Sequence, residues 1–205
     1  MIALTAAVVA AFVQEASRAR RAPPPDPMLQ LARELSRRIH RAWTQSGVSW
    51  HDWTYLLWNR RHPLHAELFD GLPVELLDAA GNRIVLWLPG HHAVMKIDLG
   101  KTGDGGTRRE AELWELVKDD PWWTDRLVPI LASGRVGDGA WSVSPAVKEI
   151  PGGRESWPGV YQLQEDLQEG TQRFRLDDIG CMNIGVHEGR YKALDFEFWE
   201  DRGPS

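Results

Sequence analysis

Asp178-Ile-Gly-Cys-Met-Asn183, followed after a short hairpin by Asp195-Phe196-Glu197, is the stretch that most constrains the fold of this chain. It places an acid, four residues, an amide and then a second acid. Asp178 can take a proton from a hydroxyl group, and the oxygens of Asn183 and Asp195 can hold Mg²⁺ against ATP phosphates. The spacing favours phosphoryl transfer. The alternative is that these side chains only cap turns, which Asp and Asn commonly do.

A lysine lies inside a predicted strand upstream of this stretch. Residues 84–88 and 93–99 are apolar, β-prone runs separated by a turn that contains proline and glycine, which predicts a hairpin. Because neighbouring side chains on a strand alternate between faces, Lys96 points away from Met95 and Ile97. Lys96 therefore lies either on a solvated edge of the sheet or in a cleft.

A helix is predicted over residues 107–118. Thr107, followed three residues later by Glu110, matches a capping box. The i, i+4, i+7 spacing also places Glu110 on the apolar face of this helix, against the sheet, where its carboxylate needs a cation. We predict that this cation is Lys96. The alternatives are that Glu110 only caps its own helix, or that Glu112 is the partner of Lys96.

Taken in order, these residues resemble the motifs of the protein-kinase-like superfamily over roughly residues 74–199. The matches are Val94-Met95-Lys96 for the V-A-I-K strand, Glu110 for the helix glutamate, Asp178 and Asn183 for the catalytic loop, and Asp195-Phe196 for D-F-G. Residues 143–147 are similar to the hinge. The resemblance implies an α+β, protein-kinase-like fold with an antiparallel small-lobe sheet, a reduced helical large lobe and an N-terminal helical extension.

The resemblance also implies that the site takes ATP and Mg²⁺. Lys96, held by Glu110, would bind the α/β phosphates of the nucleotide. A loop containing Gly81 would cover these phosphates. Asn183 and Asp195 would hold the Mg²⁺ ion.

The base implied by the resemblance is Asp178, which would orient or deprotonate the acceptor hydroxyl. Its neighbour Asp177 is an alternative, although the five-residue step to Asn183 favours Asp178. The partners expected are therefore a nucleotide and an acceptor, either a protein or a small molecule, that the sequence does not identify.

Several features depart from the family pattern. H-R-D is replaced by Leu176-Asp177-Asp178, D-F-G by Asp195-Phe196-Glu197, and the loop over residues 77–83 keeps one glycine. Only ten residues follow Asp195, which leaves no room for late peptide-docking helices. These departures keep a second function open, a non-catalytic, pseudokinase-like binding module. A third is a structural protein built around its 11 tryptophans.

The composition limits partners and location. The net charge of −5 does not favour nonspecific nucleic-acid binding. The single cysteine, Cys181, excludes an internal disulfide and favours a reducing, cytoplasmic compartment. We expect no membrane span, because the apolar run at the N-terminus is too short. Residues 3–21 are expected to form an amphipathic helix that docks on a protein surface, with membrane association as the alternative.

Three parts are expected along the chain: a helical extension over residues 1–70, a small lobe and hinge over residues 71–150, and a reduced large lobe with the catalytic hairpin over residues 151–205. We expect the first part to fill the space that late helices occupy in larger kinases. The expected elements are helices over residues 28–45, 49–59 and 160–174, a short helix or turn over residues 63–69, further strands over residues 127–132 and 141–147, and a final hairpin of residues 184–187 and 191–194.

Overall fold

The structure is a computed structural model that describes residues 26–79, 83–99, 105–148, 150, 157–177, 179–180 and 183–203. The fold is α+β, as expected from the sequence. The predicted helix over residues 3–21, the loop glycine Gly81, the proposed base Asp178 and Cys181 all lie outside the described residues.

Three helices precede the sheet: α2 Pro27–Ser46, α3 Trp50–Trp58 and α4 Pro63–Phe69. The ends of α2 follow from local chemistry. The side chain of Asp26 accepts a hydrogen bond from the Met28 amide, and Gly47 ends the helix in the left-handed conformation with φ 69°. The predictions for residues 28–45, 49–59 and 63–69 are confirmed. None of the helices in the described part of the chain has the length and hydropathy needed to cross a lipid bilayer.

Five antiparallel strands form the main sheet in the order β1-β2-β3-β5-β4. They are β1 Glu75–Asp78, β2 Arg83–Leu88, β3 Ala93–Asp98, β4 Ala132–Val136 and β5 Gly139–Pro145. β2 and β3 form the predicted hairpin through the short 3-10 helix Pro89–His91. Val85 lies opposite Lys96 in this pair, and Arg83 lies opposite Asp98. Directly opposed side chains share a face, so these four residues all face the same side of the sheet.

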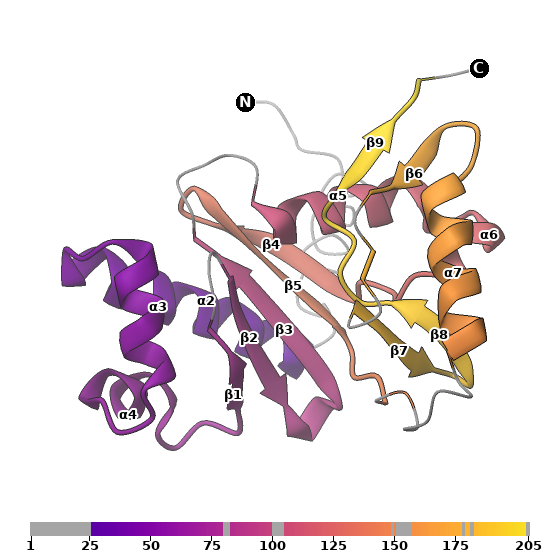
Figure 1. The fold of residues 1–205 in the computed structure, drawn as a ribbon. Helices are drawn as coiled ribbons and strands as arrows, with labels where there is room; N and C mark the ends of the chain where they lie inside the picture. The colour runs from indigo at the N-terminus through magenta and orange to yellow at the C-terminus, as the bar shows by residue number, and fades with distance from the viewer. Residues whose placement is uncertain are drawn as a thin grey trace, which may run out of the picture.

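The helices α2, α3 and α4 cover the other face of the sheet (Figure 1). Ile84 and Leu86 of β2 and Met95 of β3 are fully buried there, in one core with Leu35 of α2 and Trp53 of α3. We expected these helices in the place of the late helices of larger kinases. That expectation is wrong for residues 27–69, which pack on the small-lobe sheet and not on the large lobe. The apolar sides of these helices and of β2 and β3 bury each other there.

A second core lies on the side of the sheet that faces away from α2–α4 (Figure 1). It combines α5 Gly106–Val117, α6 Pro121–Thr124 and α7 Trp157–Glu169 with the predicted hairpin of β7 Ile184–His187 and β8 Arg190–Ala193. Leu113 of α5, Leu167 of α7 and Ala193 of β8 are fully buried in it. This core holds the end of β8, and therefore Asp195, close to α5.

The strand predicted over residues 127–132 is misplaced. β4 covers Ala132–Val136 instead, and its turn into β5 contains Gly137 with φ 57°. Gly134 is paired with Trp141, whose ring lies where a Cβ on Gly134 would be, with ring atoms at 2.6–2.9 Å from that position. A glycine is therefore required inside this strand, whereas in the sequence it indicates a loop.

The helix predicted over residues 160–174 is too long at its C-terminal end. α7 ends at Glu169, and Gly170 follows it with φ 67°. Phe174 instead begins the short strand β6 Phe174–Leu176, which pairs with β9 Trp199–Asp201. The sequence analysis did not predict this two-stranded sheet.

Candidate active site

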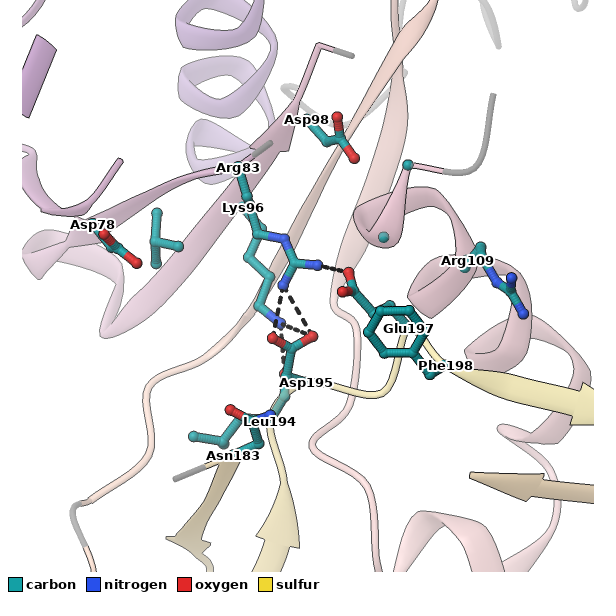
Figure 2. A pocket seen from close by; sticks show the side chains of 13 residues that line it. Asp78, Arg83, Lys96, Asp98, Arg109, Asn183, Leu194, Asp195, Glu197 and Phe198 are labelled. Carbon is teal, nitrogen blue, oxygen red and sulfur yellow. Dashed lines mark hydrogen bonds and ion pairs between the residues drawn. The ribbon is translucent and has the colours of Figure 1, made fainter. Parts of the chain in front are cut away.

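A cavity of about 730 Å³ opens on the face of the sheet that carries Lys96 (Figure 2). Its walls come from β1–β3, from the first residues of α5 and from the segment after the β7–β8 hairpin. Three residues singled out in the sequence, Lys96, Asn183 and Asp195, line this cavity together. Glu110 lies buried behind Lys96, and Gly81 and Asp178 are outside the described residues.

Lys96 and Glu110 form the predicted ion pair. The Nζ atom of Lys96 lies 2.8 and 2.9 Å from the two carboxylate oxygens of Glu110, and it also donates to the Leu194 carbonyl at 2.6 Å. The two side chains of the pair are 12% and 2% exposed. Glu112, the alternative partner, pairs with Arg108 on the surface of α5. The ammonium group thus connects β3, α5 and the residue directly before Asp195.

The capping box predicted at the start of α5 is wrong. Gly105 occupies the N-cap position and has no side chain to cap the helix, while Thr107 lies within the helix and is fully buried. The carboxylate of Glu110 faces Lys96 instead. A buried carboxylate is expensive to desolvate without a cationic partner, so the ion pair takes precedence over a local cap.

Arg83 is a site residue that the sequence analysis missed. Its Nη1 atom donates to both carboxylate oxygens of Asp195, at 2.9 and 3.0 Å, and lies 3.3 Å from Oε1 of Glu110. Figure 2 shows the guanidinium above Asp195 with the contacts between these two side chains drawn. Strand alternation could have placed Arg83 in the site, because residue 83 shares a face of the strand with Val85. The motif comparison instead places residue 83 in the preceding loop.

Glu197 stands where the D-F-G motif of the family has glycine. Its carboxylate accepts a hydrogen bond from Nη2 of Arg83, and it lies against Gly106, the first residue of α5. A Cβ atom on Gly106 would collide with the Glu197 carboxylate and the Arg83 guanidinium. The absence of a side chain at Gly106 therefore leaves the space in which this pair forms.

The charged groups of the site shift one another's pKa values. Burial raises the pKa of the Glu110 carboxyl, although the positive charges of Lys96 and Arg83 oppose this effect. Burial alone would also raise the pKa of Asp195, but the charges of Lys96 and Arg83 and the hydrogen bonds from Arg83 outweigh it and lower that pKa below its usual range. Asp195 is therefore ionised at neutral pH and is an available anionic oxygen ligand.

The donor set fits Mg²⁺ in its chemistry. Asn183 is held beside the final hairpin by its backbone, since its carbonyl accepts from the Leu194 amide at 2.8 Å. Amide and carboxylate oxygens are the hard ligands that Mg²⁺ prefers. Glu110, Asp195 and Glu197 also place one carboxylate oxygen each within 4.8 Å of the others. In this arrangement, however, both oxygens of Asp195 already accept hydrogen bonds from Arg83.

Asp177, the alternative base, lies on the surface. Its side chain is 55% exposed and pairs with Arg175 at 3.3 Å, and its amide donates to the Phe198 carbonyl at 2.7 Å. The role of Asp178 as the base stays a prediction, because Asp178 is outside the described residues.

The surroundings of Lys96 and Asp195 are kinase-like in their arrangement. A five-stranded antiparallel sheet carries the lysine, the following helix supplies its glutamate, and the acid of the D-F pair follows a hairpin. This α+β arrangement is the one that the resemblance of the motifs implies.

Comparisons with known proteins give partial similarities. No family model matches the chain, and no curated protein matches it. Among solved structures, WbdD, described as a bifunctional kinase-methyltransferase, is similar with 16% sequence identity and a TM-score of 0.43 over 60% of this chain. Vaccinia related kinase 3 is similar with 14% identity and a TM-score of 0.35 over 62% of this chain. The matched parts cover 31% of the WbdD chain and 46% of the other kinase chain.

Proposed function

We propose that the chain is a phosphotransferase that uses ATP and Mg²⁺, with an acceptor that is a protein or a small molecule. The observation that carries this proposal is the buried Lys96–Glu110 pair, because it holds an ammonium group at the wall of a cavity that Asn183 and Asp195 also line. Positioning and charge neutralisation account for most of the catalysis in phosphoryl transfer, so a few fixed charges are sufficient.

The residues would act as follows. Lys96 would bind the α/β phosphates, with Glu110 fixing the direction of its side chain, and the loop containing Gly81 would cover the nucleotide. Asn183 and Asp195 would hold Mg²⁺, which supplies charge neutralisation at the phosphates when bound. Asp178 would take the proton of the acceptor hydroxyl. The acceptor oxygen then bonds to the γ phosphorus, the bond between that phosphorus and the β–γ bridging oxygen breaks, and ADP leaves.

A second candidate function is a non-catalytic, kinase-like binding module. A specific observation favours it: Arg83 occupies both oxygens of Asp195, and Glu197 replaces the glycine of D-F-G. A chain that does not need a metal ion can keep such a contact permanently. The two functions differ in whether phosphoryl transfer occurs, and both are distinct from a structural protein without a nucleotide site.

A thermal-denaturation titration with Mg-ATP tests for the nucleotide site. A ligand present at 100 times its Kd adds about 2.7 kcal/mol to the free energy of unfolding. For a chain of this size the midpoint should rise by about 5–11 °C. An unchanged midpoint at millimolar Mg-ATP would leave the phosphotransferase without support.

Transfer of a labelled γ-phosphoryl group, to the protein itself or to water, then distinguishes the enzyme from the binding module. We expect measurable transfer by the wild type and a loss of at least tenfold in Asp178→Asn. Asp177→Asn is the matched control, since it removes the same charge one residue earlier and should leave the rate nearly unchanged. Equal rates in the wild type and Asp178→Asn would remove Asp178 from its proposed role.

A further inference from the structure

Two departures from the kinase pattern contact each other across the cavity. Arg83 lies at the start of β2, where the loop over the nucleotide would end, and Glu197 stands at the glycine position of D-F-G. The two side chains form an ion pair, and the same guanidinium donates to both oxygens of Asp195 (Figure 2). Their contact indicates that they act as one unit.

The position of Arg83 is built into the fold. Its side chain is 15% exposed, and three carboxylates on two other segments, Glu110, Asp195 and Glu197, surround the guanidinium. Burial alone would lower the pKa of Arg83, but these carboxylates outweigh it and raise that pKa. The missing side chain at Gly106 provides the space for Glu197 beside it.

The charges suit an exchange with a divalent cation. Lys96 pairs with Glu110 and lies 3.9 Å from Oδ1 of Asp195, whereas Arg83 donates hydrogen bonds to both Asp195 and Glu197. When Arg83 withdraws, the three carboxylates of Glu110, Asp195 and Glu197 share the one positive charge of Lys96, and the two negative charges in excess match the charge of one divalent ion. A guanidinium and a metal ion cannot both take the same oxygens of Asp195, because each needs direct contact with them.

From this geometry we infer that Arg83 is an internal competitor of the metal ion at Asp195, and that Glu197 retains it there. The inference rests on the proposed function, in which Asp195 binds Mg²⁺. Binding of the metal then requires Arg83 to leave Asp195. A contact between β2 and the segment that follows β8 therefore blocks the metal position at Asp195. The contact lowers the affinity for metal ions without removing a metal ligand.

The experiment measures the binding of Mn²⁺ alone, from the loss of the free-ion signal in electron paramagnetic resonance. Arg83→Gln removes the competitor, and Mn²⁺ should bind at least tenfold more tightly than to the wild type. Arg109→Gln is the matched control. Arg109 lines the same cavity, but it donates to the Trp199 carbonyl at 2.7 Å and stacks on the Trp199 ring. The control loses the same charge, so it should change the affinity by less than about threefold at 0.15 M salt.

Gly106→Ala is a second variant that leaves every charge in place. Its methyl group occupies the space of the Glu197 carboxylate and the Arg83 guanidinium and pushes the pair apart. Alanine is well tolerated in a helix, so α5 should keep its stability. We expect Mn²⁺ to bind more tightly to this variant as well. This result would exclude a general effect of net charge.

The outcomes separate this inference from the proposed function when the titrations are repeated with a nonhydrolysable ATP analogue. Tighter Mn²⁺ binding to Arg83→Gln, without analogue binding to either protein, would support the competition and contradict the nucleotide site. Analogue and Mn²⁺ binding that are equal in the wild type and Arg83→Gln would overturn the competition and leave the nucleotide site intact. An Arg109→Gln variant that gains as much Mn²⁺ affinity as Arg83→Gln would also overturn it.

Discussion

Replacing Glu110 with glutamine tests the energetic basis of the site. Glu110 is 2% exposed, and both of its oxygens accept from Lys96, with Arg83 at 3.3 Å. Removing one partner of a buried ion pair costs about 3–5 kcal/mol. We expect the lower end, about 3 kcal/mol, because Lys96 keeps the Leu194 carbonyl and Arg83 keeps Asp195. For this chain length the thermal midpoint should fall by about 6–12 °C.

The assay is urea denaturation followed by circular dichroism, with Glu112→Gln as the matched control. Glu112 lies on the same helix, is 50% exposed and pairs with Arg108 at the surface. An exposed pair at i, i+4 contributes about 0.3–0.5 kcal/mol, so the control should lose no more than that. The reasoning fails if Glu110→Gln costs no more free energy of unfolding than Glu112→Gln.

Two further predictions concern Trp53 in the core under the sheet and Asp166 on α7. Trp53→Ala should cost about 3–5 kcal/mol, because Trp53 is fully buried under the sheet, whereas Trp58→Ala on the same helix, where the side chain is 50% exposed, should cost less than about 1 kcal/mol in the same urea assay. Hydrogen bonds from Gln162 and Arg126 lower the pKa of Asp166. The Asp166 carboxylate therefore stabilises the folded state fully above the pKa that Asp166 has in the unfolded state, about 3.9. This stabilisation is lost as the pH falls through the lower pKa of Asp166 in the folded state. The difference in unfolding free energy between wild type and Asp166→Asn should be about 1 kcal/mol at pH 7 and should shrink below about pH 4; a difference that is unchanged at pH 3 would contradict this.

The pairing of Lys96 with Glu110 could be predicted from the sequence because it depends on two periodicities. Strand alternation fixes the face of Lys96, and helical spacing fixes the face of Glu110. Both segments are long enough to show their pattern. A buried carboxylate and a buried ammonium group on facing elements are then expected to pair, because an unpaired buried charge is strongly destabilising.

Arg83 could not be placed in the same way. Its partners Asp195 and Glu197 are 112 and 114 residues away in sequence, and no local pattern connects them. Glu197 departs from the D-F-G motif in the sequence, and its contact with Arg83 exists only in the folded chain. The role of such residues becomes visible when the tertiary structure brings them together.

The remaining errors have local causes. Gly134 interrupts the pattern of β4 because the ring of Trp141 lies over it. The strands β6 and β9 have three residues each, which is too short for an alternating pattern to be recognised. The sequence predicts helices at α2–α4, but it does not show which face of the sheet they cover. The division into three parts at residues 70 and 150 and the cytoplasmic location stay predictions.

The most direct test of the nucleotide site is calorimetric titration of Mg-ATP into the wild type and Lys96→Met. Lys118→Met is the control, because Lys118 is 42% exposed, pairs with Glu115 and carries the same charge. We predict saturable binding to the wild type and to Lys118→Met, and affinity at least tenfold lower in Lys96→Met. Equal affinities in all three proteins would show that the ammonium group of Lys96 does not contact the phosphates.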